Sequence, residues 1–147
     1  MFQCENKMIR LALYKGKGNW VNALIRWRTQ SIYSHCEIIA NDYWYSSTVH
    51  DGGVRVKKFL PDEISWDVIE IPFIAAEQIE NHFNNTKNKP YGWLDLFQSQ
   101  LLGRRTGDNR GDFCSEWCAD ALGLESATRY SPGLLGEVVK WAVQVKK

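Results

Sequence analysis

The sequence lacks the features that would place it in a membrane, export it through a signal peptide or cross-link it with disulfides. Its 147 residues contain no apolar run near the ~20 residues that a membrane-spanning helix needs. The segment Met1–Lys7 lacks the basic-then-apolar order of a signal peptide. The four cysteines show no disulfide-framework spacing. These absences lead us to expect a cytoplasmic protein in a reducing environment.

An excess of charge is missing as well. The formal net charge is +1, and the basic residues are spread along the chain rather than clustered. Neither a nucleic acid nor an acidic lipid is therefore an expected partner. The chain has no internal repeats and no low-complexity segment, and its length and 44% hydrophobic content fit one compact domain over residues 1–147.

What the sequence does contain is a series of short alternating strands set between helical patterns. Alternating polarity predicts strands over residues 9–14, 34–40, 43–48, 54–59 and 66–71. Apolar spacing of three and four predicts helices over residues 19–28, 74–85, 91–102 and 113–122, and one from about residue 132. This order favours an α+β fold with a mostly antiparallel sheet over a doubly wound parallel sheet.

One of the predicted helices begins with a cysteine. Asp112 is a plausible N-cap, and Gly123 stops the helix, so Cys114 falls in the first turn. Unpaired backbone N–H groups and the positive dipole end favour a thiolate there. Cys114 is therefore the candidate nucleophile, with its backbone N–H as an oxyanion donor.

The candidate base is His35, on the second predicted strand. Strand alternation places His35 and Glu37 on one face and Cys36 on the other. If Asn41-Asp42 is a two-residue hairpin loop, Ser46 lies opposite Glu37. The residue that orients the His35 ring would be Glu37, with Ser46 or Ser47 of the next strand as alternatives.

A zinc site competes with this interpretation, because four side chains could serve as ligands: His35, Cys36, Cys114 and Cys118. Adjacent strand residues point to opposite faces, however, and Cys-x3-Cys is not the usual zinc-knuckle spacing. We therefore interpret Cys36 and Cys118 as core residues and expect no cofactor. The apolar stripe that contains Trp20 and Trp27 is likewise expected to lie in the core.

Two motifs resemble one known family. A histidine in Tyr33-Ser34-His35-Cys36-Glu37-Ile38, followed much later by Phe113-Cys114-Ser115-Glu116 at a helix start, resembles the circularly permuted papain-like hydrolases. This is the permuted branch of the NlpC-type superfamily, which includes lecithin:retinol acyltransferase-like enzymes. The resemblance covers roughly residues 9 to 135, with the segments 20–28, 52–56 and 91–94 as weaker support.

The resemblance implies a small α+β fold whose cysteine helix packs against the sheet. It also implies hydrolysis or acyl transfer through an acyl-cysteine intermediate, with Cys114 as nucleophile and His35 as base. The family's third polar residue often lies on the strand after the histidine, where this sequence offers Ser46 and Ser47. We expect a peptide, a cell-wall peptide or a lipid acyl substrate. A binding module that has lost its chemistry is the alternative.

Overall fold

A single antiparallel sheet organises the protein. The computed structural model describes residues 8–48, 53–60, 62–87 and 113–147. The sheet has five strands in the order β4-β3-β2-β1-β5, and every neighbouring pair is antiparallel. The strands are β1 (Ile9–Tyr14), β2 (His35–Ala40), β3 (Tyr43–Thr48), β4 (Gly53–Lys57) and β5 (Trp66–Ile71). The α+β class and the antiparallel sheet predicted from the sequence are thus confirmed.

A tight hairpin sets the register between β2 and β3. Asn41 and Asp42 have φ angles of 50° and 66°, the left-handed conformation that a two-residue turn needs to match the strand twist. Ala40 pairs with Tyr43, as the sequence predicted, and the ladder continues to Ile38 opposite Tyr45. With this register, alternation along each strand decides which side chains share a face.

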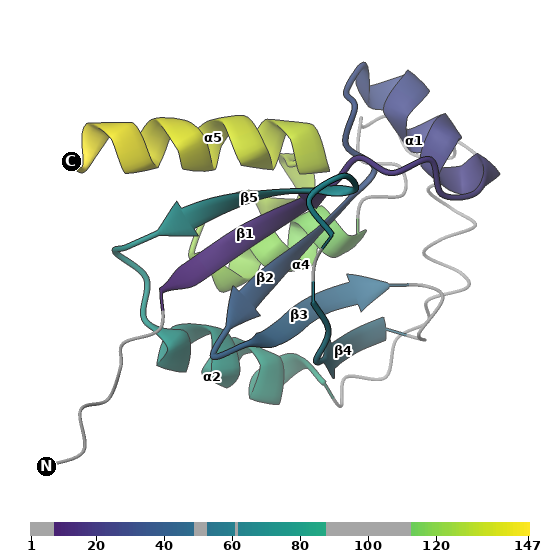
Figure 1. The fold of residues 1–147 in the computed structure, drawn as a ribbon. Coiled ribbons are helices and arrows are strands. Elements are labelled where there is room, and N and C mark those ends of the chain that lie inside the picture. The colour runs from purple at the N-terminus through teal and green to yellow at the C-terminus, as the bar shows by residue number, and fades with distance from the viewer. Residues whose placement is uncertain (1–7, 49–52, 61, 88–112) are drawn as a thin grey trace, which may run out of the picture.

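Helices cover one face of the sheet (Figure 1). They are α2 (Ala76–Thr86), α4 (Phe113–Ala121) and α5 (Pro132–Val145), with a short 3-10 turn at Ala127–Arg129 between the last two. α4 packs over β2 and β3, while α5 packs over β1 and β5. Gly136 permits that close approach, because a Cβ there would lie 2.6 Å from Leu13 Cδ1. The main core lies between these layers.

The opposite face carries a smaller aromatic cluster. Ala12, Ile39 and Trp44 are buried there, with Phe59 and Trp66 packed against them. The rings of Trp44 and Phe59 stack with their centroids 4.1 Å apart. Side chains on both faces of β2 are therefore shielded from water.

Helix α1 (Trp20–Thr29) forms where the sequence predicted a helix, but its apolar stripe does not face the core. The side chains of Trp20 and Trp27 are 70% and 68% exposed, and Leu24 is 38% exposed. The expectation that these tryptophans lie in the core was wrong. The helix turns its polar side inward instead.

Hydrogen bonds explain that orientation. Asn22 Nδ2 donates to Ser34 Oγ at 2.8 Å, and Arg26 donates to the carbonyl oxygens of Gly16 and Lys17 at 2.7 and 3.0 Å. Asn19 and Asn22 also exchange backbone-to-side-chain hydrogen bonds in a reciprocal cap at the helix start. Because these polar groups hold α1 to the body of the protein, its apolar stripe is left outside.

Some sequence predictions lie outside the described residues. These are the helix over residues 91–102 and the N-cap at Asp112. Within the part of the chain that is described, no helix is long and apolar enough to cross a membrane.

Candidate active site

The imidazole of His35 lies at the start of β2, largely shielded from water. Its side chain is 19% exposed, and Nε2 lies 2.9 Å from Glu37 Oε1. The ring of Trp66 approaches it edge-on, with centroids 6.2 Å apart. Since Glu37 engages Nε2, Nδ1 is the ring nitrogen left for a partner on the other side.

Glu37 is held by an arginine that the sequence analysis did not single out. The Glu37 side chain is 2% exposed, and Arg55 Nη1 donates to its Oε2 at 3.1 Å, while Arg55 Nη2 contacts Oε1. This is the bidentate geometry in which a guanidinium binds a carboxylate most strongly. These two contacts with Arg55 fix the Glu37 carboxylate, which in turn holds the His35 ring.

Ser46 lies between Glu37 and Arg55 across the sheet. Ser46 pairs with Arg55 in the β3–β4 ladder, and the β2–β3 register continues to place Glu37 on its other side. Its small side chain leaves room for the guanidinium to reach Glu37. Ser46 Oγ donates to the Cys36 carbonyl oxygen at 2.9 Å, so Glu37, and not Ser46, contacts the His35 ring in this structure.

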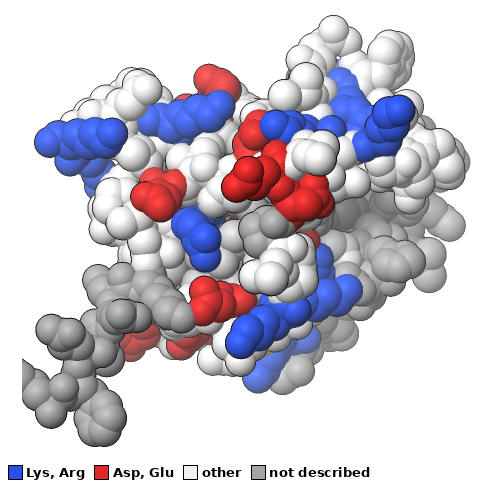
Figure 2. All heavy atoms as spheres, in the orientation of Figure 1, with Lys and Arg blue, Asp and Glu red and all other residues white. Residues whose placement is uncertain are grey.

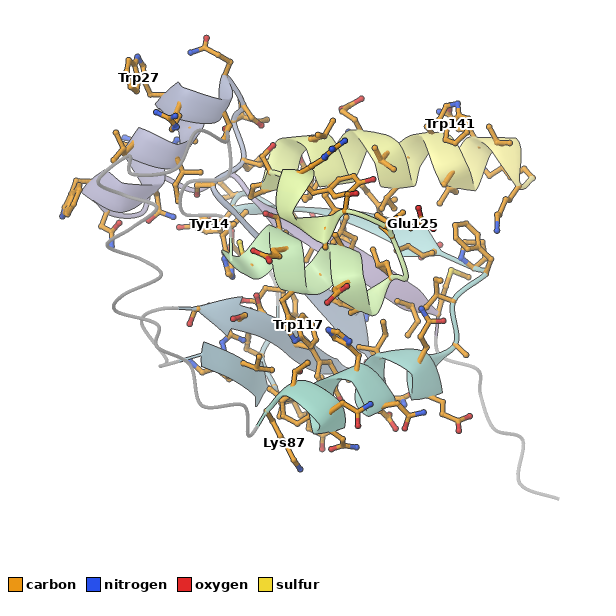
Figure 3. All side chains as sticks on the ribbon, turned by 180° about the vertical axis from the view of Figure 1, so that it is seen from behind. Tyr14, Trp27, Lys87, Trp117, Glu125 and Trp141 are labelled. Carbon is orange, nitrogen blue, oxygen red and sulfur yellow. The ribbon has the colours of Figure 1, made fainter. Side chains whose placement is uncertain are left out.

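Cys114 lies in the first turn of α4, as predicted, and its thiol is close enough to the side chains of His35 and Cys36 for each of them to shift its pKa. Two contacts fix how α4 lies on the sheet. Ser115 Oγ donates to the Tyr130 carbonyl oxygen at 2.5 Å. Trp117 Nε1 donates to Thr86 Oγ1 at 3.0 Å, and Figure 3 shows the Trp117 ring between α4 and α2.

The end of α4 also follows the prediction. Gly123 has a φ of 80°, a left-handed conformation that suits glycine, and its N–H bonds to the carbonyl oxygen of Asp120. The N–H of Leu124 bonds back to Ala119. These bonds stop the helix at its predicted place.

Three buried free thiols meet beneath α4. Cys36, Cys114 and Cys118 share the main core, and Cys118 Sγ lies 3.8 Å from the Cys36 carbonyl oxygen. Burial raises the pKa of Cys118. Cys118 is thus a buried thiol of the core, one helical turn beyond Cys114.

The ionisable groups of the site shift one another. Burial alone lowers the pKa of His35, but the charge of a Cys114 thiolate and hydrogen bonds with Cys114 and Glu37 raise it to about 10. Burial alone raises the pKa of Glu37, but hydrogen bonds with His35 and Arg55 hold it below its usual value. The hydrogen bond with Cys36, together with burial, raises the pKa of Cys114 well above that of an ordinary thiol, although His35 opposes this.

The pKa shifts of the thiol and the imidazole cannot both apply in full. A raised pKa keeps Cys114 neutral, and a neutral Cys114 has no charge with which to raise the pKa of His35. Glu37 is ionised in either case, so we assign the raised pKa of His35 to Glu37 and that of Cys114 to Cys36 and burial. Thiol and imidazole then titrate as one coupled pair. Cys114 therefore rests as the protonated thiol at neutral pH.

The thiolate expected from the helix start is therefore not the resting form of Cys114. The helix start favours the thiolate, but the contact with Cys36 and the burial of the sulfur oppose it and prevail. The sequence could not show this, because strand alternation places Cys36 on the opposite face from His35. The thiol must give up its proton before the sulfur can act as a nucleophile.

The zinc alternative gains no geometric support. Among the described residues, no group of three or more His, Cys, Asp or Glu side chains is arranged to hold a metal ion.

Arg55 could have been identified from the sequence. The alternation of Val54-Arg55-Val56 places Arg55 on the same face of the sheet as Glu37.

Comparisons of the chain with models of known protein families, with curated protein sequences and with solved structures gave no match.

Proposed function

We propose that the protein is a cysteine hydrolase that cleaves an amide or ester bond through an acyl-cysteine intermediate. The observation that carries the proposal is a set of four interacting side chains: Glu37 hydrogen-bonds to His35 and to Arg55, and Cys114 lies close enough to His35 for each to shift the pKa of the other. Acyl transfer needs a nucleophile, a base and a residue that orients the base, all within hydrogen-bond reach of one another.

The roles follow from the contacts. Glu37 accepts a hydrogen bond from Nε2–H of His35, which leaves Nδ1 of the ring for the thiol. The Cys114 sulfur attacks the substrate carbonyl as its proton moves to His35, which then protonates the leaving amine or alkoxide. Water, deprotonated by His35, attacks the acyl-cysteine carbonyl and releases the acid, and the proton returns to the thiol. A backbone N–H at the start of α4 would stabilise the oxyanion.

The fold we propose for this chemistry is the permuted papain-like one. The order of the elements supports it, since the histidine strand precedes the cysteine helix and that helix packs across β2 and β3 of an antiparallel sheet. β1 pairs with β2 on the side away from β3, and β5 is the edge strand beyond β1.

One observation favours the alternative, a binding module on the same fold. The Cys114 side chain is only 6% exposed and its pKa is raised, so the resting thiol is poorly nucleophilic. An enzyme with this site would work best at alkaline pH, whereas a binding module would show no turnover at any pH.

The test uses intact-mass trapping of the acyl-enzyme. Wild type is incubated at pH 7 to 9 with p-nitrophenyl acyl esters and with aminoacyl-coumarin amides. We expect turnover with a transient acyl adduct on Cys114, and loss of at least about a thousandfold in kcat/KM for Cys114→Ala. Cys118→Ala is the matched control, because it removes a buried thiol from the same helix.

An unchanged rate in Cys114→Ala would overturn the proposal, as would an adduct on Cys118. Absence of turnover across the whole ester and amide panel, with Cys114 inert to iodoacetamide up to pH 9, would establish the binding module instead.

A further inference from the structure

Helix α1 exposes an apolar face to solvent. Its exposed side is apolar and consists of Trp20, Ala23, Leu24 and Trp27, which we call the α1 face. Exposed contiguous apolar surface of this kind on a folded domain marks a place where another surface binds. The inward bonds of Asn22 and Arg26 mean that α1 cannot turn this face to the core without breaking them.

A basic cavity continues the α1 face toward α5. The cavity has a volume of about 520 Å³ and is lined by Trp27 and Leu134 on its apolar sides and by Arg28 and Arg129. Among the described residues, no Asp or Glu lines the cavity and neither arginine forms an ion pair with a carboxylate. We call it the arginine pocket.

Charge is segregated in this part of the chain. Residues 6–36 contain six Lys or Arg and no Asp or Glu, although the whole protein is nearly neutral. In Figure 2 the described surface at α1 shows basic side chains, and acidic side chains gather beside it, nearer the middle of that view. Tryptophans beside basic residues, with no acidic residue among them, are the pattern of a helix that lies in the interface of an anionic bilayer.

From this arrangement we infer that the α1 face docks on an anionic phospholipid membrane, with Trp20, Leu24 and Trp27 in the headgroup–acyl boundary. The arginine pocket receives a lipid phosphate. Trp27 borders both the face and the pocket, so one orientation of the protein satisfies both contacts. The docked protein keeps the polar side of α1 on Ser34, the residue before His35.

The inference does not depend on the proposed hydrolase, because it uses no atom of Cys114 or His35. The test is flotation of the purified protein with phosphatidylcholine vesicles that contain or lack phosphatidylglycerol. We expect binding to the anionic vesicles only, weakened by added salt. Cys114→Ala should bind as wild type does.

Two sets of variants separate the apolar and the charged contacts. Trp20→Ser with Trp27→Ser should weaken vesicle binding about a hundredfold, since burial of each ring is worth about a factor of ten. Arg28→Gln with Arg129→Gln should weaken it by about tenfold or more and reduce its salt dependence. Trp141→Ser is the matched control: Trp141 is 64% exposed on α5, and Figure 3 shows it away from Trp27.

Three results would overturn the inference. One is wild-type protein that fails to float with anionic vesicles, or floats equally with neutral ones. Another is an equal loss of binding in Trp141→Ser. The third is a wild-type dimer that the double tryptophan variant converts to monomer, without vesicle binding, since the α1 face would then be covered by a second copy of the chain.

Discussion

The candidate active site and helix α1 depart from the usual sorting of side chains in opposite directions. At the site, charged Glu37 and Arg55 are buried at 2% and 14% side-chain exposure, while on α1 the rings of Trp20 and Trp27 face water. Charged groups are normally outside and large apolar groups inside. Each departure has a free-energy cost that the rest of the fold must offset, so each marks a part of the molecule shaped by something other than folding stability.

The two regions are also held in different ways. The site depends on buried, charge-assisted contacts in which loss of one partner leaves the other unpaired. Helix α1 depends on a few polar bonds near the surface, and its apolar side makes little contact with the body of the protein. Substitutions should therefore be costly at the site and tolerated on α1.

The largest difference should come from Arg55. Arg55→Met leaves Glu37 buried without its guanidinium, and we expect the free energy of unfolding in urea to fall by about 3 kcal/mol or more. Trp27→Ser, on the exposed side of α1, should change it by no more than about 0.5 kcal/mol. Equal effects of the two substitutions would remove the contrast between the regions.

The second effect is a dependence of stability on pH. Glu37 raises the pKa of His35 above 6.5 in the folded protein, so the stabilising contribution of this ion pair is complete below pH 6.5 and is lost as the pH rises above that value. The lowered pKa of Glu37 adds stability that is lost as the pH falls below 4.5. Stability should therefore be greatest between these values and decline by about 1–2 kcal/mol toward pH 10.

Urea midpoints measured at intervals from pH 4 to 10 would check this profile. His35→Gln should flatten the part from pH 6.5 to about 8, because it removes the titrating ring, while the raised pKa values of Cys114 and Cys118 keep a decline at higher pH. A decline of the same size over that range in the variant would assign the effect to other groups.

The third effect concerns Cys36. Because its hydrogen bond raises the pKa of Cys114, Cys36→Ala should lower that pKa and speed the alkylation of Cys114 by iodoacetamide at pH 7 by about fivefold. The rate is followed by peptide mass spectrometry. Cys118→Ala, which removes the other buried thiol, should leave the rate within about twofold; a slower reaction in Cys36→Ala would show that Cys36 activates Cys114.

The smallest effect should come from the polar side of α1. Asn22→Ala removes the bond to Ser34 and half of the reciprocal cap, at a cost of about 1 kcal/mol. Amide hydrogens of α1 should then exchange about five times faster, while those of β2 keep their rates. Trp20→Ala, on the opposite side of the helix, serves as the control and should leave the exchange of both elements unchanged.

Local pattern predicted most of the fold. The strands, the hairpin at Asn41-Asp42 and the stop at Gly123 each depend on a few neighbouring residues, and each was found where the sequence placed it. Alternation along β2 also placed His35 beside Glu37, and the contact between their side chains agrees with that parity.

What the sequence did not show depends on contacts between distant segments. A helical period predicts an apolar face on α1 but not its direction, which the bonds of Asn22 and Arg26 decide. The contact of Cys36 with Cys114 joins a strand and a helix far apart in the chain. The net charge of +1 did not indicate the basic character of the α1 region, because the acidic residues that balance it lie elsewhere in the sequence.

The order of the site residues along the chain has a consequence during synthesis. Translation proceeds from the amino end, so the hairpin that carries His35 and Glu37 leaves the ribosome well before Cys114 is made. Hairpin pairing is local and fast, whereas docking of α4 must wait for a distant segment. If the protein is the hydrolase proposed above, a nascent chain carries the His35–Glu37 pair without its nucleophile, and the site is completed only when α4 docks on the sheet.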